Sequence, residues 1–193
     1  MTGDSRSRFS KFKKPAMLST IVFCEDKPAS APGRDLAGVL ARTLACLVPA
    51  KVEGLLCDVR IAGPAGTGLS LVANHAGCAL IEAENEADWL SLALQAARGP
   101  DIFLLRCGRA PEAGFIEEAA DFLAADTKDS SRAAWLRAAP ESFLERVFLS
   151  LAPVAGLIAP HYLMLRAPRG GFSNLASFVA PSTAFQTRAR RIG

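Results

Sequence analysis

Reactive and charged side chains close one apolar stretch of the chain. Residues 102–107 are apolar except for Arg106, and Cys107 and Gly108 follow directly. Such a run is typical of a central strand buried on both faces, and open α/β sheets bind ligands beyond the carboxyl ends of their strands. A guanidinium at that place must reach solvent, pair with an acid or face a pocket that admits an anion. We therefore expect any ligand site to have its floor at Arg106.

Carboxylates are absent from this strand end, which limits its chemistry. Mg²⁺ and Mn²⁺ are held by hard carboxylate oxygens, which a cysteine and a glycine do not offer. We therefore expect no metal ion and no cofactor there. Glu25 and Asp26 follow the first predicted strand on the same rim, where they either contact a nucleobase or ribose or are simply solvated. His75 and His161 are interpreted as ordinary polar residues rather than catalysts.

The cysteines lie far apart in the sequence. They form no C-x-x-C pair and have no histidine nearby, which argues against a zinc site or a disulfide framework. The pattern favours a reducing compartment, and we expect a cytoplasmic protein. The residues concerned are Cys24, Cys46, Cys57, Cys78 and Cys107.

Apolar patterns over residues 18–125 predict alternating strands and helices. Short apolar runs predict buried strands, and apolar residues at helical spacing predict helices with one buried face. The expected strands are 18–24, 52–61, 78–83 and 102–107. The expected helices are 34–48, which Pro49 should end, 69–75, 84–97 and 111–125. This alternation predicts a parallel sheet with right-handed crossovers.

The alternation lapses after residue 125. We expect a strand at 133–138, an apolar helix over 141–157, a last strand at 162–166 and a turn at 170–172. A weak helix should then lead into the basic end at 188–191.

Length and charge bound the domain organisation. With 193 residues, of which 50% are hydrophobic, the chain can bury one core. We expect a single domain over 17–193, preceded by a disordered basic extension at 1–16. The net charge is +3 and basic residues gather at both ends, which is typical of solvated tails rather than of nucleic-acid binding. We expect no signal peptide and no transmembrane helix.

Several phrases together carry a family resemblance. They are LSTIVFCED, RTLACLVP, GLLCDVRIAG, AGCALIEAE, QAARGPDIFLLRCG, FIEEAADFL and the late RGGF. With this order of elements, the chain resembles the glycosyltransferase family 2 domain of the GT-A fold. The resemblance implies a three-layer α/β sandwich with a mostly parallel central sheet. It also implies a nucleotide diphosphate sugar donor, used by most members with a divalent metal.

Three functional positions of that family differ here. The second strand ends in Ile61-Ala62-Gly63, where the family has an aspartate that contacts the nucleobase. The fourth ends in Arg106-Cys107-Gly108, where the family has the metal-binding Asp-x-Asp. After the late Gly-Gly-Phe the family has an acidic pair that supplies the base, and residues 178–191 contain no acid. We therefore expect no catalytic residue and no metal ligand, as in a pseudoenzyme.

The resemblance leaves three functions open. The first is binding of a nucleotide sugar, a nucleoside diphosphate or a protein partner, with metal-dependent sugar transfer lost or impaired. The second is an active transferase in which Arg106 or Arg109 neutralises the diphosphate without metal. The third is a membrane-surface accessory, peripheral to the inner membrane, that uses helix 141–157 and the basic ends. The candidate nucleotide-binding residues are Cys24, Glu25, Asp26, Gly63, Arg106 and Gly108.

Overall fold

The computed structural model describes residues 18–25, 35–125, 132–148, 152–181 and 183–192. The predicted basic extension at 1–16 and the candidate residue Asp26 lie outside these ranges.

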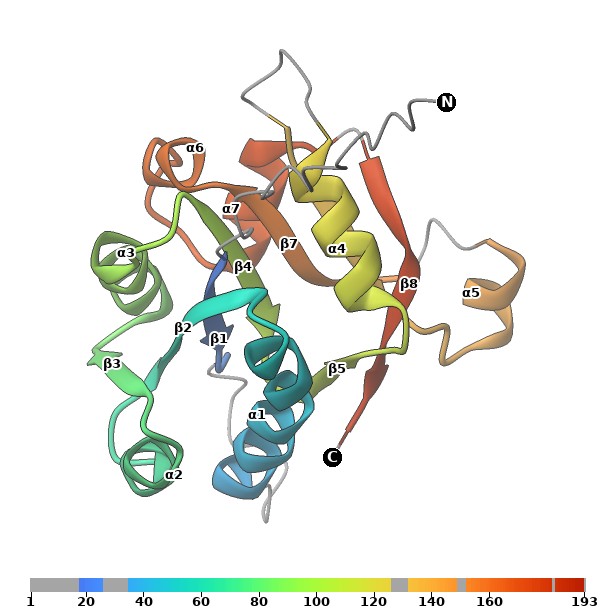
Figure 1. The fold of residues 1–193 in the computed structure, drawn as a ribbon. Coiled ribbons are helices and arrows are strands. Elements are labelled where there is room, and N and C mark those ends of the chain that lie inside the picture. Colours follow the sequence, from blue (N-terminus) through green and yellow to red (C-terminus); the bar gives the residue numbers. More distant parts are fainter. Residues whose placement is uncertain (1–17, 26–34, 126–131, 149–151, 182, 193) are drawn as a thin grey trace, which may run out of the picture.

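The described residues form one eight-stranded sheet with helices on both faces (Figure 1). The strand order is β3-β2-β1-β4-β7-β6-β8-β5. The strands are β1 (Leu18–Phe23), β2 (Leu56–Pro64), β3 (Ala79–Ala83), β4 (Asp101–Arg106), β5 (Arg109–Pro111), β6 (Ala134–Ala138), β7 (Val154–Pro160) and β8 (Thr183–Arg191). The helices are α1 (Leu36–Val52), α2 (Leu69–Ala76), α3 (Glu86–Ala96), α4 (Phe115–Ala124), α5 (Phe143–Val147), α6 (His161–Leu165) and α7 (Phe172–Val179).

The first half of the sheet is parallel, as the alternation predicted. β1 pairs with β2 and with β4, and β2 pairs with β3, all in parallel. Every residue of β1 is buried, as are Ile102 to Leu105 of β4, because helices cover both faces of these strands. The parallel register brings the carboxyl ends of β1 and β4 together, with Phe23 opposite Arg106.

Two hydrophobic clusters fill the spaces between the layers. One lies under α1, α2 and α4, with Leu40, Leu69 and Phe115 among its buried residues. The other lies under α3, α6 and α7, with Trp89 and Phe172. The three-layer sandwich with a mostly parallel sheet is thereby confirmed. No helix among the described residues is long and apolar enough to cross a membrane.

The prediction of one apolar helix over 141–157 was wrong. Its first part is the short helix α5, and its last part is the strand β7, which pairs antiparallel with β4 and with β6. A short apolar run fits a buried strand as well as a buried helix. Here β4 and β6 each offer backbone N–H and C=O groups on one edge, and residues 154–160 pair with both as a strand.

Four further predictions need correction. Residues 162–166 form most of helix α6 rather than a strand, because β7 already covers the edge of β4 as far as Pro160. The basic end 188–191 belongs to strand β8, which pairs with β6 and β5. Helix α1 continues through Pro49 to Val52, where burial of Leu47 and Ala50 outweighs the missing N–H group. The expected strand 52–61 accordingly begins at Leu56.

Candidate functional site

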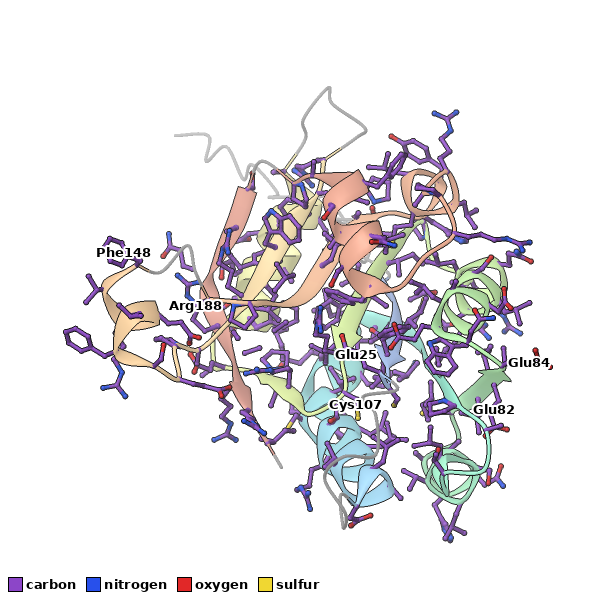
Figure 2. The ribbon with its side chains drawn as sticks, turned by 180° about the vertical axis from the view of Figure 1, so that it is seen from behind. Glu25, Glu82, Glu84, Cys107, Phe148 and Arg188 are labelled. Carbon is purple, nitrogen blue, oxygen red and sulfur yellow. The ribbon has the colours of Figure 1, made fainter. Side chains whose placement is uncertain are left out.

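A cavity of about 220 Å³ lies at the carboxyl ends of β1 and β4. Glu25 and Cys107, both labelled in Figure 2, lie at these two strand ends. Its walls come from segments that are distant in sequence. The lining residues are Phe23, Glu25, Leu36, Val39, Arg106, Cys107, Gly108, Arg109, Pro153, Val154, Arg191 and Ile192. The edge predicted for ligand binding is therefore hollowed, and three arginines line it.

Arg106 is held from three sides. Its Nη1 forms an ion pair with Glu25, and its Nη2 donates to the Ser173 hydroxyl at 3.2 Å. The guanidinium carbon lies 4.3 Å from the centroid of the Phe172 ring, within the range of a cation–π contact. Both partners of the ion pair are about three-quarters buried, at 24% and 19% exposure. Pairing with a carboxylate of the protein, one of the options open to Arg106, is what the structure shows.

A second ion-pair cluster lies at the rim of the cavity. Glu141 accepts from Arg109 at 2.7 Å and from Arg191 at 3.4 Å. The hydrogen bond from Arg109 is the main cause that holds the pKa of Glu141 below its usual value. The sequence pattern pointed to Arg109 but not to Arg191 or Glu141. No local signal marks these two residues, because Glu141 follows β6 and meets Arg191 only where β6 pairs with β8.

Two of the predicted residues support the cavity without lining it. Cys24 is fully buried, and its pKa is raised first by a hydrogen bond with the Cys107 thiol and then by burial. A Cβ atom on Gly63 would lie 2.9 Å from the Cβ of Cys24 and 2.7 Å from Leu69 Cδ1. A glycine at this position therefore lets the end of β2 pack closely against Cys24 and α2.

Gly108 turns the chain out of β4. Its φ of +83° is in the left-handed region, which favours glycine. Its N–H donates to the Thr43 hydroxyl of α1 at 2.9 Å. Of the six predicted nucleotide-binding residues, Glu25, Arg106 and Gly108 thus line one cavity.

The donor atoms at this cavity do not fit Mg²⁺ or Mn²⁺. Glu25 is the one carboxylate among the lining residues, and Arg106 already neutralises it. Within the described ranges, no group of three or more histidine, cysteine or acidic residues is placed to hold a metal ion. Hard divalent cations need several oxygen ligands, so we derive no chemistry through a metal here.

A larger groove, of about 580 Å³, lies between α1 and α2. Its walls are mostly apolar, with Lys51, His75 and Cys78 as the charged or titratable exceptions. It lacks the converging polar groups that orient a small ligand. The arginine-lined cavity is therefore the better candidate site.

Comparisons with known proteins identify the fold. No family model matches the chain, and no curated protein matches it in sequence. Among solved structures, glucosyl-3-phosphoglycerate synthase from Mycobacterium tuberculosis, in complex with Mn²⁺, uridine diphosphate and glucosyl-3-phosphoglycerate, matches with a TM-score of 0.62 at 12% identity. That match covers 91% of this chain and 72% of the other. Mannosyl-3-phosphoglycerate synthase from Rubrobacter xylanophilus matches with a TM-score of 0.56 at 13% identity, over 91% and 67%. The chain has the GT-A glycosyltransferase fold, as the sequence predicted.

Proposed function

We propose that this chain, which has the GT-A fold, binds the diphosphate of a nucleotide or nucleotide sugar at the Arg106 cavity without a metal ion. We further propose that metal-dependent sugar transfer is lost. The observation that carries the proposal is the lining of the cavity, in which Arg106 stands where the family has a metal-binding acid and Arg109 and Arg191 add two further guanidinium groups.

The charges around the cavity favour an anion. The three arginines carry three positive charges, and Glu25 and Glu141 oppose them with two, so one positive charge is in excess among these described side chains. A phosphate group competes well for a guanidinium, because it accepts two parallel hydrogen bonds from it. Each arginine exchanges a carboxylate partner for a phosphate, and the displaced Glu25 or Glu141 then turns to solvent.

The size of the cavity limits what it encloses. Whole drug-sized ligands usually occupy pockets of about 300 to 1,000 Å³, and this cavity measures about 220 Å³. That volume suits a diphosphate, with the nucleoside and the sugar extending across the rim. The Phe23 and Leu36 side chains provide apolar contacts beside it.

Loss of sugar transfer follows from two separate absences. Residues 178–191 contain no acid that could take a proton from an acceptor hydroxyl, and general base catalysis contributes typically a factor of about 10² to 10⁴ in rate. The end of β4 offers no carboxylate to hold a metal that would neutralise the leaving diphosphate. Arginines alone stabilise that charge but remove no proton.

The experiment is calorimetric titration with uridine diphosphate, guanosine diphosphate and uridine diphosphate glucose in the presence of EDTA. We expect one site for at least one of these ligands. Glu25→Gln should tighten binding, because it frees Arg106 from a competing carboxylate. Arg109→Ala should weaken binding. Arg98→Ala is the matched control, since Arg98 is an exposed arginine that precedes β4 at the opposite end of the strand, and it should leave binding unchanged.

Other results would overturn the proposal. Binding that requires Mn²⁺ would contradict the metal-free site, and Glu25→Gln without any gain in affinity would mean that Arg106 only holds the fold together. Transfer or hydrolysis of the sugar in EDTA would instead support an active, metal-independent transferase. No binding of any ligand would leave a protein partner as the function to test.

A further inference from the structure

Helix α5 and Phe148, directly after it, expose four large apolar side chains. Phe143 is 75% exposed, Leu144 62%, Val147 55% and Phe148 56%. None of the residues of α5 is buried, and Figure 1 shows the helix beyond β8, outside the three layers. Buried aromatic side chains stabilise a fold strongly, so two exposed phenylalanines within six residues indicate a surface that contacts something else.

The structure holds this short helix in place from its base. Ser142 and Glu145 form a capping box around the first turn. Glu141, directly before it, forms ion pairs with Arg109 and Arg191 of β5 and β8. The helix is therefore fixed to the edge of the sheet while its apolar side chains point to solvent, as Phe148 does in Figure 2.

Arginines on α5 and on the neighbouring strand β8 (Figure 1) are exposed to solvent. Arg146 on α5 and Arg190 on β8 are both exposed. This arrangement favours contact with a negatively charged surface.

We propose that α5 and the surrounding arginines dock on an anionic phospholipid bilayer. The phenylalanines enter the boundary between headgroups and acyl chains, and Arg146 and Arg190 bind lipid phosphates. This is a different contact from a long membrane-surface helix, because a five-residue tip inserts while the sheet edge supplies the charge.

The shape and size of the tip favour a lipid surface over a second copy of the chain. The four side chains expose on the order of 400 Å² of apolar surface. A stable protein interface buries about 800 Å² on each partner. A bilayer needs no shape complementarity, and each buried apolar side chain adds to the affinity directly.

Docking would also place the candidate site near the membrane. Glu141 joins the base of α5 to two of the arginines that line the cavity. The bilayer contact does not depend on the proposed nucleotide binding, and the two are tested separately.

The test is co-sedimentation of the full chain with vesicles of phosphatidylcholine alone or mixed with phosphatidylglycerol. We expect binding to the mixed vesicles, weakened as salt rises from about 50 to about 300 mM because the charges are screened. Phe143→Ser combined with Phe148→Ser should weaken it at least about ten-fold. Phe143→Trp should show a blue-shifted emission that brominated lipids quench.

Matched variants separate the contribution of α5 to vesicle binding from that of the basic residues 1–16, which are the same in every variant. Val52→Ser combined with Leu71→Ser removes two equally exposed apolar side chains from α1 and α2, and should change nothing. The double variant Arg146→Ala with Arg190→Ala should weaken vesicle binding. The control double variant Arg42→Ala with Arg98→Ala, which removes the same charge elsewhere, should weaken it by a smaller factor.

Three results would overturn the proposal. They are no binding at low salt, equal binding to neutral vesicles, and unchanged binding of the Phe143 and Phe148 double variant. A dimer in sedimentation velocity that this variant dissociates, without vesicle binding, would assign α5 to a second copy.

Discussion

The two ends of the same parallel strands carry arginine–carboxylate pairs in different settings. Towards the amino end, Asp58 of β2 pairs at 2.9 Å with Arg60, in the middle of the same strand, with 22% and 11% of the side chains exposed. At the carboxyl end, Arg106 pairs with Glu25 at similar exposure, but there the pair lines a cavity. The chemistry of the two pairs is nearly the same, and their surroundings differ.

At the amino end every polar group of the key serine is occupied. Ser19 is fully buried, donates to Asp58, and accepts from the backbone N–H groups of Arg98 at 3.0 Å and Gly99 at 2.7 Å. One donor and two acceptors are all that a hydroxyl has, so this cluster is closed to a ligand. At the carboxyl end the Arg106 and Glu25 side chains line a cavity of about 220 Å³. The comparison separates a structural ion pair from one that a ligand can exchange.

The largest expected effect is that of Asp58→Ala. It leaves Arg60 buried without its carboxylate and removes the acceptor of Ser19, which should lower the free energy of unfolding by about 3 kcal/mol. Glu25→Ala should cost about 1 kcal/mol, because Arg106 keeps Ser173, the Phe172 ring and access to solvent. Urea titration of both variants measures the difference. Equal losses would mean that the two pairs are alike.

Two serines provide a smaller and cleaner comparison. Ser19→Ala leaves the N–H groups of Arg98 and Gly99, one part-buried and one buried, without an acceptor and should cost about 2 kcal/mol. Ser173→Ala removes one exposed contact to Arg106 and should cost less than about 0.5 kcal/mol. Thermal unfolding followed by circular dichroism distinguishes them. A large loss for Ser173→Ala would show that the cavity pair, too, is part of the structural core.

The smallest effect is a pH dependence of opposite sign at the two ends. Burial raises the pKa of Asp101, at the amino end of β4, against a smaller lowering by Arg132. A carboxyl group whose pKa is raised in the folded state stabilises the fold at low pH, and this contribution is lost as the pH rises. The free energy of unfolding of Asp101→Asn should therefore increase relative to that of the wild type between about pH 3 and pH 6. The pKa of Glu141 is lowered, chiefly by Arg109. The free energy of unfolding of Glu141→Gln should therefore decrease relative to that of the wild type as the pH rises. Urea midpoints at several pH values test both slopes, and parallel slopes would contradict the comparison.

The sequence predicted the first half of the fold well, because its signals are local. β1 and β4 each contain an apolar stretch, and β2 and β3 contain apolar residues with a few charged ones between them. The helices between these strands have one apolar face. Each strand–helix–strand unit predicts a parallel strand pair. The crossover helix returns the chain to the end of the sheet at which the first strand began, so the next strand runs in the same direction. The left-handed turn at Gly108 also follows from residue type.

The second half was predicted less well, because its backbone partners lie far along the chain. The apolar run 154–160 fits a buried helix as well as a buried strand. It forms a strand because it pairs with β4 and β6. β5 has three residues and no pattern of its own, and it exists because β8 lies beside it.

The sequence by itself determined that the end of β4 carries an arginine in place of acids, and hence that a divalent metal has no hard ligands there. The tertiary structure decided what that arginine contacts. Arg106 and Glu25 are 81 positions apart, and they meet because β1 and β4 pair in register. Arg191 lies opposite Arg109 through the pairing of β5 with β8, and Glu141, which follows β6, comes beside Arg191 through the pairing of β6 with β8. Ion pairs depend on distance in space, and strand pairing alone brings these residues together.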